Sequence, residues 1–181
     1  GSYNSGSNTS NTAGARESHG QVVITYQSAP VIASTTIASS NATIAVTFSK
    51  AVYNTNGGSG ALEASDFSLS ISGGAASLSS ATPTSISASG NVYTLGIGLS
   101  GTPNGSETLT VNPVDNGIYD AAGNEASTSQ SNNTVNLIEK ILPTITGVSL
   151  ASNNSTIAVT ISEAVYNTNG GSGALEASDF S

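Results

Sequence analysis

The sequence predicts an all-β protein built from antiparallel β-sandwiches, and three observations support this prediction. Apolar residues alternate with small polar residues in runs of about five to eight, which is the pattern of a half-buried strand. Stretches rich in Gly, Asn, Pro and Ser, such as "NTNGGSG" and "GTPNGSE", separate these runs and are typical of turns. A segment of 28 residues occurs twice, at 41–68 and at 154–181.

Residues 1–28 form a leader that differs in composition from the rest of the chain. Its first part, "GSYNSGSNTSNTAGARES", is of low complexity and is typical of a flexible linker. The β-branched stretch "QVVITY" follows it and predicts one strand. That strand comprises Gln21, Val22, Val23, Ile24, Thr25 and Tyr26.

This strand is surplus, because the next segment has a first strand of its own, and two interpretations stay open. It either ends a preceding domain or augments an incomplete sheet of a neighbouring copy, as in donor-strand complementation. Head-to-tail donation of this kind does not close on itself and builds a filament.

The strands of the first sandwich are expected within 29–140. A first strand is expected around Ile32 and Ile37, after Pro30. The later strands supply the expected core, which comprises Ile44, Val46, Phe48, Phe67, Leu69, Ile71, Tyr93, Leu95, Ile97, Leu99, Leu109, Val111, Val135 and Leu137. About seven or eight short strands in about 110 residues fit an antiparallel Greek-key immunoglobulin-like β-sandwich.

The repeat extends this prediction to a tandem array. The two copies are offset by 113 residues, and they differ at three positions, which are Ala42/Ser155, Phe48/Ile161 and Lys50/Glu163. Solenoid repeats have periods of up to about 50 residues, so this offset indicates repeated whole domains. Residues 29–140 form repeat 1, and 141–181 form the N-terminal part of an incomplete repeat 2, which cannot cover its own inner face. We expect this chain to be a piece of a longer array; the alternative is that another chain completes repeat 2.

Several motifs resemble a known family. The stretches "VTFSKAVYN", "ASDFSLSISGG", "NVYTLGIGL" and "ETLTVNPVDNGIYDAAGN", with a closing "NTVNL", resemble bacterial immunoglobulin-like repeats of the SbsA type and the SWM type. Repeat 2 carries the acidic form "TISEAV" with Glu163, whereas repeat 1 departs from it with Lys50. The resemblance implies stalk or spacer modules of large surface adhesins, S-layer-associated proteins and filaments.

Composition excludes several functional classes. With 11 acidic and 3 basic residues, the formal net charge is −8, which disfavours nucleic acid and anionic membranes as partners. There is no cysteine, and no apolar run approaches the length needed to span a membrane. The acidic, Ser/Thr/Asn-rich and nearly lysine-free chain is typical of an extracellular protein of the bacterial cell surface. His19 in the leader is the only histidine, so we expect no enzymatic activity.

One loop carries residues that suit a calcium ion. Asp115, Asp120, Asn124 and Glu125 offer the oxygen ligands that Ca²⁺ prefers, although their spacing matches no EF-hand loop. We favour the alternative that they are solvated loop residues that stabilise turns, and expect no cofactor. Glycans are a further expected surface feature, because Asn-x-Ser/Thr sequons occur at Asn8, Asn41, Asn104, Asn132, Asn153 and Asn154.

These observations favour a non-enzymatic extracellular structural protein, a tandem stalk or filament module whose partners are neighbouring repeats of the same chain. Self-assembly into a filament remains open. One alternative is a carbohydrate- or ligand-binding module, which the absence of tryptophan disfavours. Another is an accessory domain of a secreted enzyme.

Overall fold

The computed structural model describes residues 26–180, and the protein over this range is all-β with several antiparallel sheets. The residues Gln21, Val22, Val23, Ile24 and Thr25 of the predicted leader strand lie outside the described range, as does His19. Tyr26 is described, is 86% exposed and belongs to no strand. No helix in the described range is long and apolar enough to cross a bilayer.

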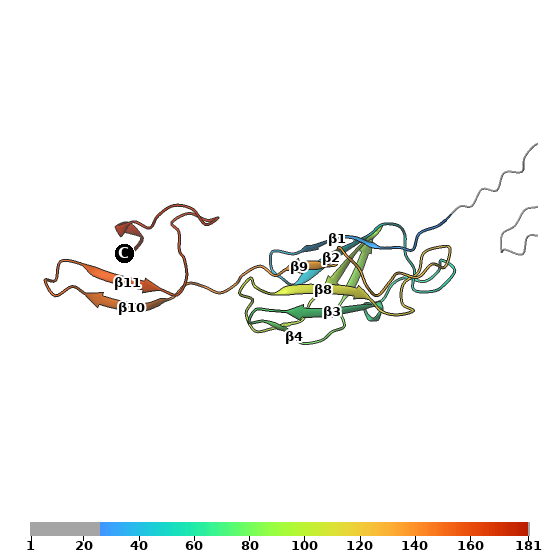
Figure 1. Cartoon of the computed structure of the whole chain (residues 1–181), viewed down its shortest axis with the longest axis horizontal. Coiled ribbons are helices and arrows are strands. Elements are labelled where there is room, and N and C mark those ends of the chain that lie inside the picture. Colours follow the sequence, from blue (N-terminus) through green and yellow to red (C-terminus); the bar gives the residue numbers. More distant parts are fainter. Residues whose placement is uncertain (1–25, 181) are drawn as a thin grey trace, which may run out of the picture.

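The first sheet has four strands in the order β1-β2-β6-β5, and every neighbouring pair is antiparallel. Figure 1 labels β1 and β2 of this sheet. Its alternating sequences put one face of each central strand toward the core, as the pattern predicts. The strands are β1 (Ile32–Ile37), β2 (Thr43–Phe48), β5 (Ile86–Ser89) and β6 (Val92–Gly96). β5 was not predicted, because "ISAS" carries a single large apolar residue.

The second sheet has three strands in the order β3-β8-β9, again antiparallel. They are β3 (Phe67–Ser72), β8 (Thr108–Pro113) and β9 (Thr134–Asn136). A single 3₁₀ turn, η1 (Ala64–Asp66), leads into β3. Two short strands, β4 (Ser77–Leu78) and β7 (Leu99–Ser100), pair at the margin.

Both sheets contribute to one continuous core, as a β-sandwich requires. Ile44, Val46 and Leu95 of the first sheet and Leu109 and Val111 of the second are fully buried in it. All the expected core residues are buried or half-buried, which confirms that part of the prediction. The buried hydrophobic residues that alternation did not reveal lie in loops, at Val52, Leu62, Ala76, Ile118 and Ala126.

Three aromatic rings connect the sheets at the centre of this core. The ring centroid of Phe48 on β2 lies 5.8 Å from that of Tyr93 on β6, in an edge-on arrangement. Phe67 on β3 lies 6.2 Å from Phe48 and 6.3 Å from Tyr93. Ring pairs at these separations add to the stability that burial alone provides.

The second copy of the repeated segment reproduces the backbone of the first. β10 (Ile145–Leu150) and β11 (Ile157–Ile161) form an antiparallel pair, and η2 (Ala177–Phe180) follows. Leu150 pairs with Ile157 just as Ile37 pairs with Ile44, and both hairpins shift register at the equivalent point. The sequence repeat is therefore also a repeat of local structure.

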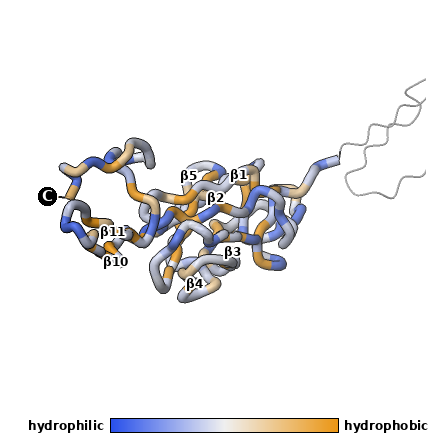
Figure 2. Tube along the Cα trace, turned by 60° about the vertical axis from the view of Figure 1, so that its left-hand side comes forward, coloured by the Kyte–Doolittle hydropathy of each residue, from blue (hydrophilic) through white to orange (hydrophobic). Residues whose placement is uncertain are grey.

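The two copies differ in what covers them. Within the described residues, β10 and β11 pair only with each other. Ile44 is 0% exposed and its counterpart Ile157 is 62% exposed; Phe67 is 1% exposed and Phe180 is 51% exposed. Apolar stretches follow the path of the second hairpin as they do in the sandwich (Figure 2).

We predict that one substitution has opposite consequences in the two copies. Ile44→Ala should lower the free energy of unfolding of the sandwich by about 2–5 kcal/mol, because it opens a cavity in a packed core. Ile157→Ala changes the same residue in the same local sequence, and should leave that free energy within about 0.5 kcal/mol. Urea unfolding of the full chain, followed by circular dichroism, measures both. Equal losses would contradict the burial of Ile44 between two sheets.

Candidate functional site

Asp120 is the buried centre of the loop that the sequence marked for calcium. Its Oδ1 accepts hydrogen bonds from the backbone N–H groups of Ala122 and Asn124, both at 2.9 Å. The side-chain amide of Asn124 donates to both oxygens, at 3.2 and 3.0 Å. Asp120 therefore closes its own loop, as an Asp in a turn does.

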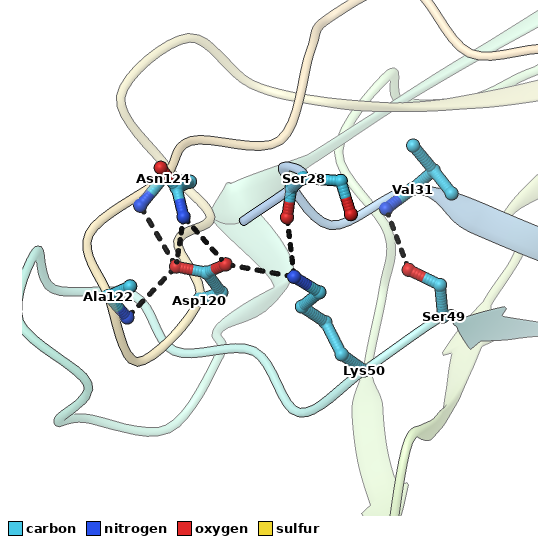
Figure 3. Close-up of polar contacts among 7 residues, drawn as sticks. All are labelled: Ser28, Val31, Ser49, Lys50, Asp120, Ala122 and Asn124. Carbon is cyan, nitrogen blue, oxygen red and sulfur yellow. Dashed lines mark hydrogen bonds and ion pairs between the residues drawn. The ribbon is translucent and has the colours of Figure 1, made fainter. Parts of the chain in front are cut away.

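Lys50 contacts the carboxylate of Asp120 on the side opposite Asn124 and Ala122 (Figure 3). Its Nζ lies 3.1 Å from Asp120 Oδ2 and also donates to the backbone carbonyl of Ser28. Lys50 follows β2, whereas Asp120 lies beyond the end of β8, so the pair connects segments 70 residues apart in sequence. The loop is thereby fixed to the end of the sandwich at which the chain enters.

These contacts set the protonation state of Asp120. Burial alone would raise the pKa of its carboxyl group, but hydrogen bonds from Asn124, Lys50 and Ala122 outweigh burial and lower that pKa to about 2. The group is a carboxylate at neutral pH, with its oxygens already accepting hydrogen bonds.

The other calcium candidates form a separate group. The backbone N–H of Asn116 donates to Glu125, and its side-chain amide donates to Asp115 at 2.9 Å. No side-chain hydrogen bond joins this group to Asp120 or Asn124 in the described part of the chain. Over residues 26–180, no three His, Cys, Asp or Glu side chains gather in a way that could hold a metal ion. The four candidates thus fall into two groups, and the expectation that they are loop residues which stabilise turns stays a prediction.

Glu107 is a buried carboxylate that the sequence analysis did not single out. It immediately precedes β8 and is 0% exposed. Its Oε1 accepts from the backbone N–H groups of Ala75, Ala76 and Asn104 at 2.7–3.1 Å, and its Oε2 from Asn104 and Gly105. One side chain thus binds two loops that are some thirty residues apart, and both are rich in glycine.

The loop around Glu107 requires glycine at position 74. Gly74 has a φ of +65°, and a Cβ atom there would lie 2.2 Å from the carboxylate carbon of Glu107. Burial alone would raise the pKa of Glu107, but the backbone donors outweigh burial and lower it to about 2. In the sequence Glu107 follows the turn-like stretch "GTPNGS". Such a stretch has no alternation of apolar and polar residues, so the sequence did not indicate that Glu107 is buried.

Asn41 is a sequon that the structure places inside the sandwich. It is 1% exposed, and its side chain exchanges two hydrogen bonds with the backbone of Ile138, at 2.6 and 2.9 Å. The turn after β1 is thereby attached to the segment that leaves the sandwich after β9. A glycan on Asn41 is incompatible with this folded arrangement, whereas Asn104, Asn132, Asn153 and Asn154 lie at exposed positions.

The acid pair at the start of β3 also has a structural role. The carboxylate of Asp66 accepts a hydrogen bond from the backbone N–H of Glu63 at 2.7 Å, which closes η1. Asp179 and Glu176 repeat this contact at 2.8 Å. The acidic residues of both copies therefore hold loops and turns in place.

We predict that acid destabilises the sandwich through Glu107 and Asp120. Both folded-state pKa values, about 2, lie below the ordinary values near 4, so the stabilising contribution is complete above about pH 4.5 and is lost as the pH falls toward 2. Glu107→Gln should cost about 1–3 kcal/mol at pH 7 because an amide nitrogen replaces one acceptor oxygen. It should also flatten the loss between pH 4.5 and 2. The control Glu139→Gln, at an exposed position, should change neither. Urea unfolding at several pH values measures both effects, and an unchanged slope in Glu107→Gln would contradict the assignment.

We also predict that calcium leaves the melting temperature unchanged. An ion that binds only the folded state raises this temperature by mass action. The oxygens of Asp120 already accept hydrogen bonds, and Asp115 and Glu125 are held by Asn116. Differential scanning calorimetry in EDTA and in millimolar Ca²⁺ checks this. A rise with Ca²⁺ that disappears in Asp115→Asn would instead establish a calcium site in this loop.

Comparison of the chain with models of protein families, with curated proteins and with solved structures finds no match. Asp120, Glu107 and Asp66 accept hydrogen bonds from nearby backbone and side-chain groups, and these contacts close loops.

Proposed function

We propose that this chain is a non-enzymatic extracellular structural protein, in which immunoglobulin-like sandwiches follow one another in a tandem array. Such an array forms the stalk of a bacterial surface adhesin, a pilus-like fibre or an S-layer-associated protein. The observation that carries the proposal is the repeat of register between β1–β2 and β10–β11, at the same 113-residue offset as the sequence repeat. A chain that builds the same hairpin again after one sandwich has begun a second sandwich.

The strand order supports the immunoglobulin-like part of the proposal. A constant-type immunoglobulin domain has four strands in one sheet, in the order A-B-E-D, and three in the other, in the order C-F-G. The orders β1-β2-β6-β5 and β3-β8-β9 match this scheme when the strands are lettered along the chain and the short pair β4–β7 is left aside. Greek-key connections follow from this order.

The path of the chain supports the role of a stalk. The chain enters beside Lys50, which binds the carbonyl of Ser28, and leaves beside Asn41, which binds the backbone of Ile138. These two points lie at opposite ends of β1, because Ser28 precedes this strand and Asn41 lies in the turn that follows it. Each sandwich in the array would therefore extend the stalk by about the length of its strands. A pulling force on the stalk would act along the direction of these strands.

The carbohydrate-binding alternative has less support. Sugar sites use exposed aromatic rings. In the first sandwich Phe48, Phe67 and Tyr93 pack together in the core, and Tyr53 and Tyr119 are half-buried. The exposed rings of Tyr26, Tyr166 and Phe180 lie outside this sandwich. The composition agrees with exposure to the extracellular medium, since the chain is acidic, rich in Ser, Thr and Asn, and nearly free of lysine.

We predict that antibodies raised against the full chain label the surface of intact cells of the source organism. Immunogold electron microscopy without permeabilisation measures this, and a strain that lacks the gene is the control. The proposal is wrong if gold particles appear only after the envelope is opened.

A further inference from the structure

The second hairpin, β10–β11, exposes apolar residues such as Leu150 and Ile157. We call this surface its apolar face; the equivalent surface of β1–β2 is covered in the first sandwich. We call 29–68 and 142–181 the two first halves, and 69–140 the second half. In the sandwich, β6 of the second half pairs with β2, and Leu95 lies opposite Ile44. Both residues are buried there, whereas Ile157 on the second hairpin is exposed. The shape and register of β10–β11 therefore fit a second half of a sandwich.

Position 163 is where the two first halves differ in charge. Just before position 163, the backbone N–H of Ser162 donates to the carbonyl oxygen of Thr144 at 2.8 Å. The equivalent residue before Lys50, Ser49, donates in the same way to the carbonyl oxygen of Val31 at 2.9 Å. Glu163 thus occupies the backbone position of Lys50. A second half that covers β10–β11 in the manner of the first sandwich places its loop against Glu163.

The second half of this chain does not suit that position. Lys50 and Asp120 form the one salt bridge among the described residues, and the side chain of Asp120 is 5% exposed. With Glu163 in the place of Lys50, whose side chain is 33% exposed, a second carboxylate would face the buried carboxylate of Asp120 and repel it. Glu163 Oε1 is enclosed and accepts no hydrogen bond within the described residues. This oxygen needs a hydrogen-bond donor, and a donor with positive charge would restore the opposite-charge pair that Lys50 and Asp120 form in the first sandwich.

We propose that the apolar face of β10–β11 and η2 takes the second half of a sandwich that presents a basic side chain opposite Glu163. The residue at position 50 or 163 then determines which second half a first half accepts. Lys50 selects the half with Asp120, and Glu163 rejects it. This inference rests on the proposed function only in treating 142–181 as the first half of a sandwich.

The test joins a second copy of 69–140 to the full chain directly after Ser181. Hydrogen–deuterium exchange with mass spectrometry then follows the amides of β11 (Ile157–Ile161), which need a covering strand for protection. The parent extended chain is compared with Glu163→Lys, which recreates the Lys50–Asp120 pair, and with the neutral Glu163→Gln. Lys50→Glu in the first sandwich is the mirror-image control, read at β2 (Thr43–Phe48).

We expect β11 to exchange at least about tenfold more slowly in Glu163→Lys than in the parent, with Glu163→Gln between them. Lys50→Glu should accelerate exchange at β2. Equal protection of β11 with glutamate and lysine would overturn the selection by charge and leave the proposed array intact. No protection with any residue at position 163 would instead overturn the proposed array.

Two further outcomes would overturn the assignment of the partner. If Ca²⁺ slowed exchange in the parent extended chain to the rate of Glu163→Lys, a bound divalent cation would replace the basic side chain. If β11 were already protected in the original chain and deletion of 1–28 removed that protection, the leader would be the occupant of the face.

Discussion

The structure depends on one constraint, which is that each sheet of the sandwich has an apolar face that only the other sheet can cover. Hydrogen bonding within a sheet satisfies the backbone but leaves this face in water. The rings of Phe48 and Tyr93 on the first sheet meet the ring of Phe67 on the second sheet. These contacts bury the three rings between the two sheets. The same constraint explains the second hairpin, in which the backbone forms with the same register while Phe180 and Ile157 remain exposed. The two hairpins thus share one pattern of strand pairing, and the described residues bury the apolar face of the first hairpin alone.

A second constraint acts at the ends of the sandwich, where strands give way to loops rich in Gly, Asn and Ser with few apolar residues. Glu107 before β8 and Asp120 beyond it each accept several hydrogen bonds from backbone N–H groups of the loops. Without these carboxylates, those N–H groups would be enclosed donors that lack a partner. A carboxylate suits this task because it offers only acceptors and can receive several donors at once. The acidic composition of the chain therefore has a structural explanation in part, since these carboxylates stabilise loops in which few residues are apolar.

The sequence predicted the strands well and the loop contacts poorly, for physical reasons. Alternation reveals burial because side chains of a strand point to opposite faces, so Ile44, Val46 and Leu109 were identified without knowledge of the partners. Glu107 and Asn41 were missed as buried residues, because their contacts are with backbone groups distant in sequence, and no pattern marks them. The loop from Asp115 to Glu125 looked like one cluster in the sequence, yet the turns within it direct these side chains into two separate groups.

The three differences between the repeated segments acquire meaning from the contacts they make. Ala42 is exposed, so its exchange for Ser155 alters little, whereas Phe48 and Lys50 both contact the second half of the sandwich. Identical neighbouring domains in one chain are prone to misassembly, because the first half of one can pair with the second half of another. Replacing a phenylalanine in the aromatic cluster and reversing one charge changes the contact between halves without changing the hairpin. An array can in this way repeat its fold closely while each half still distinguishes its own partner from that of its neighbour.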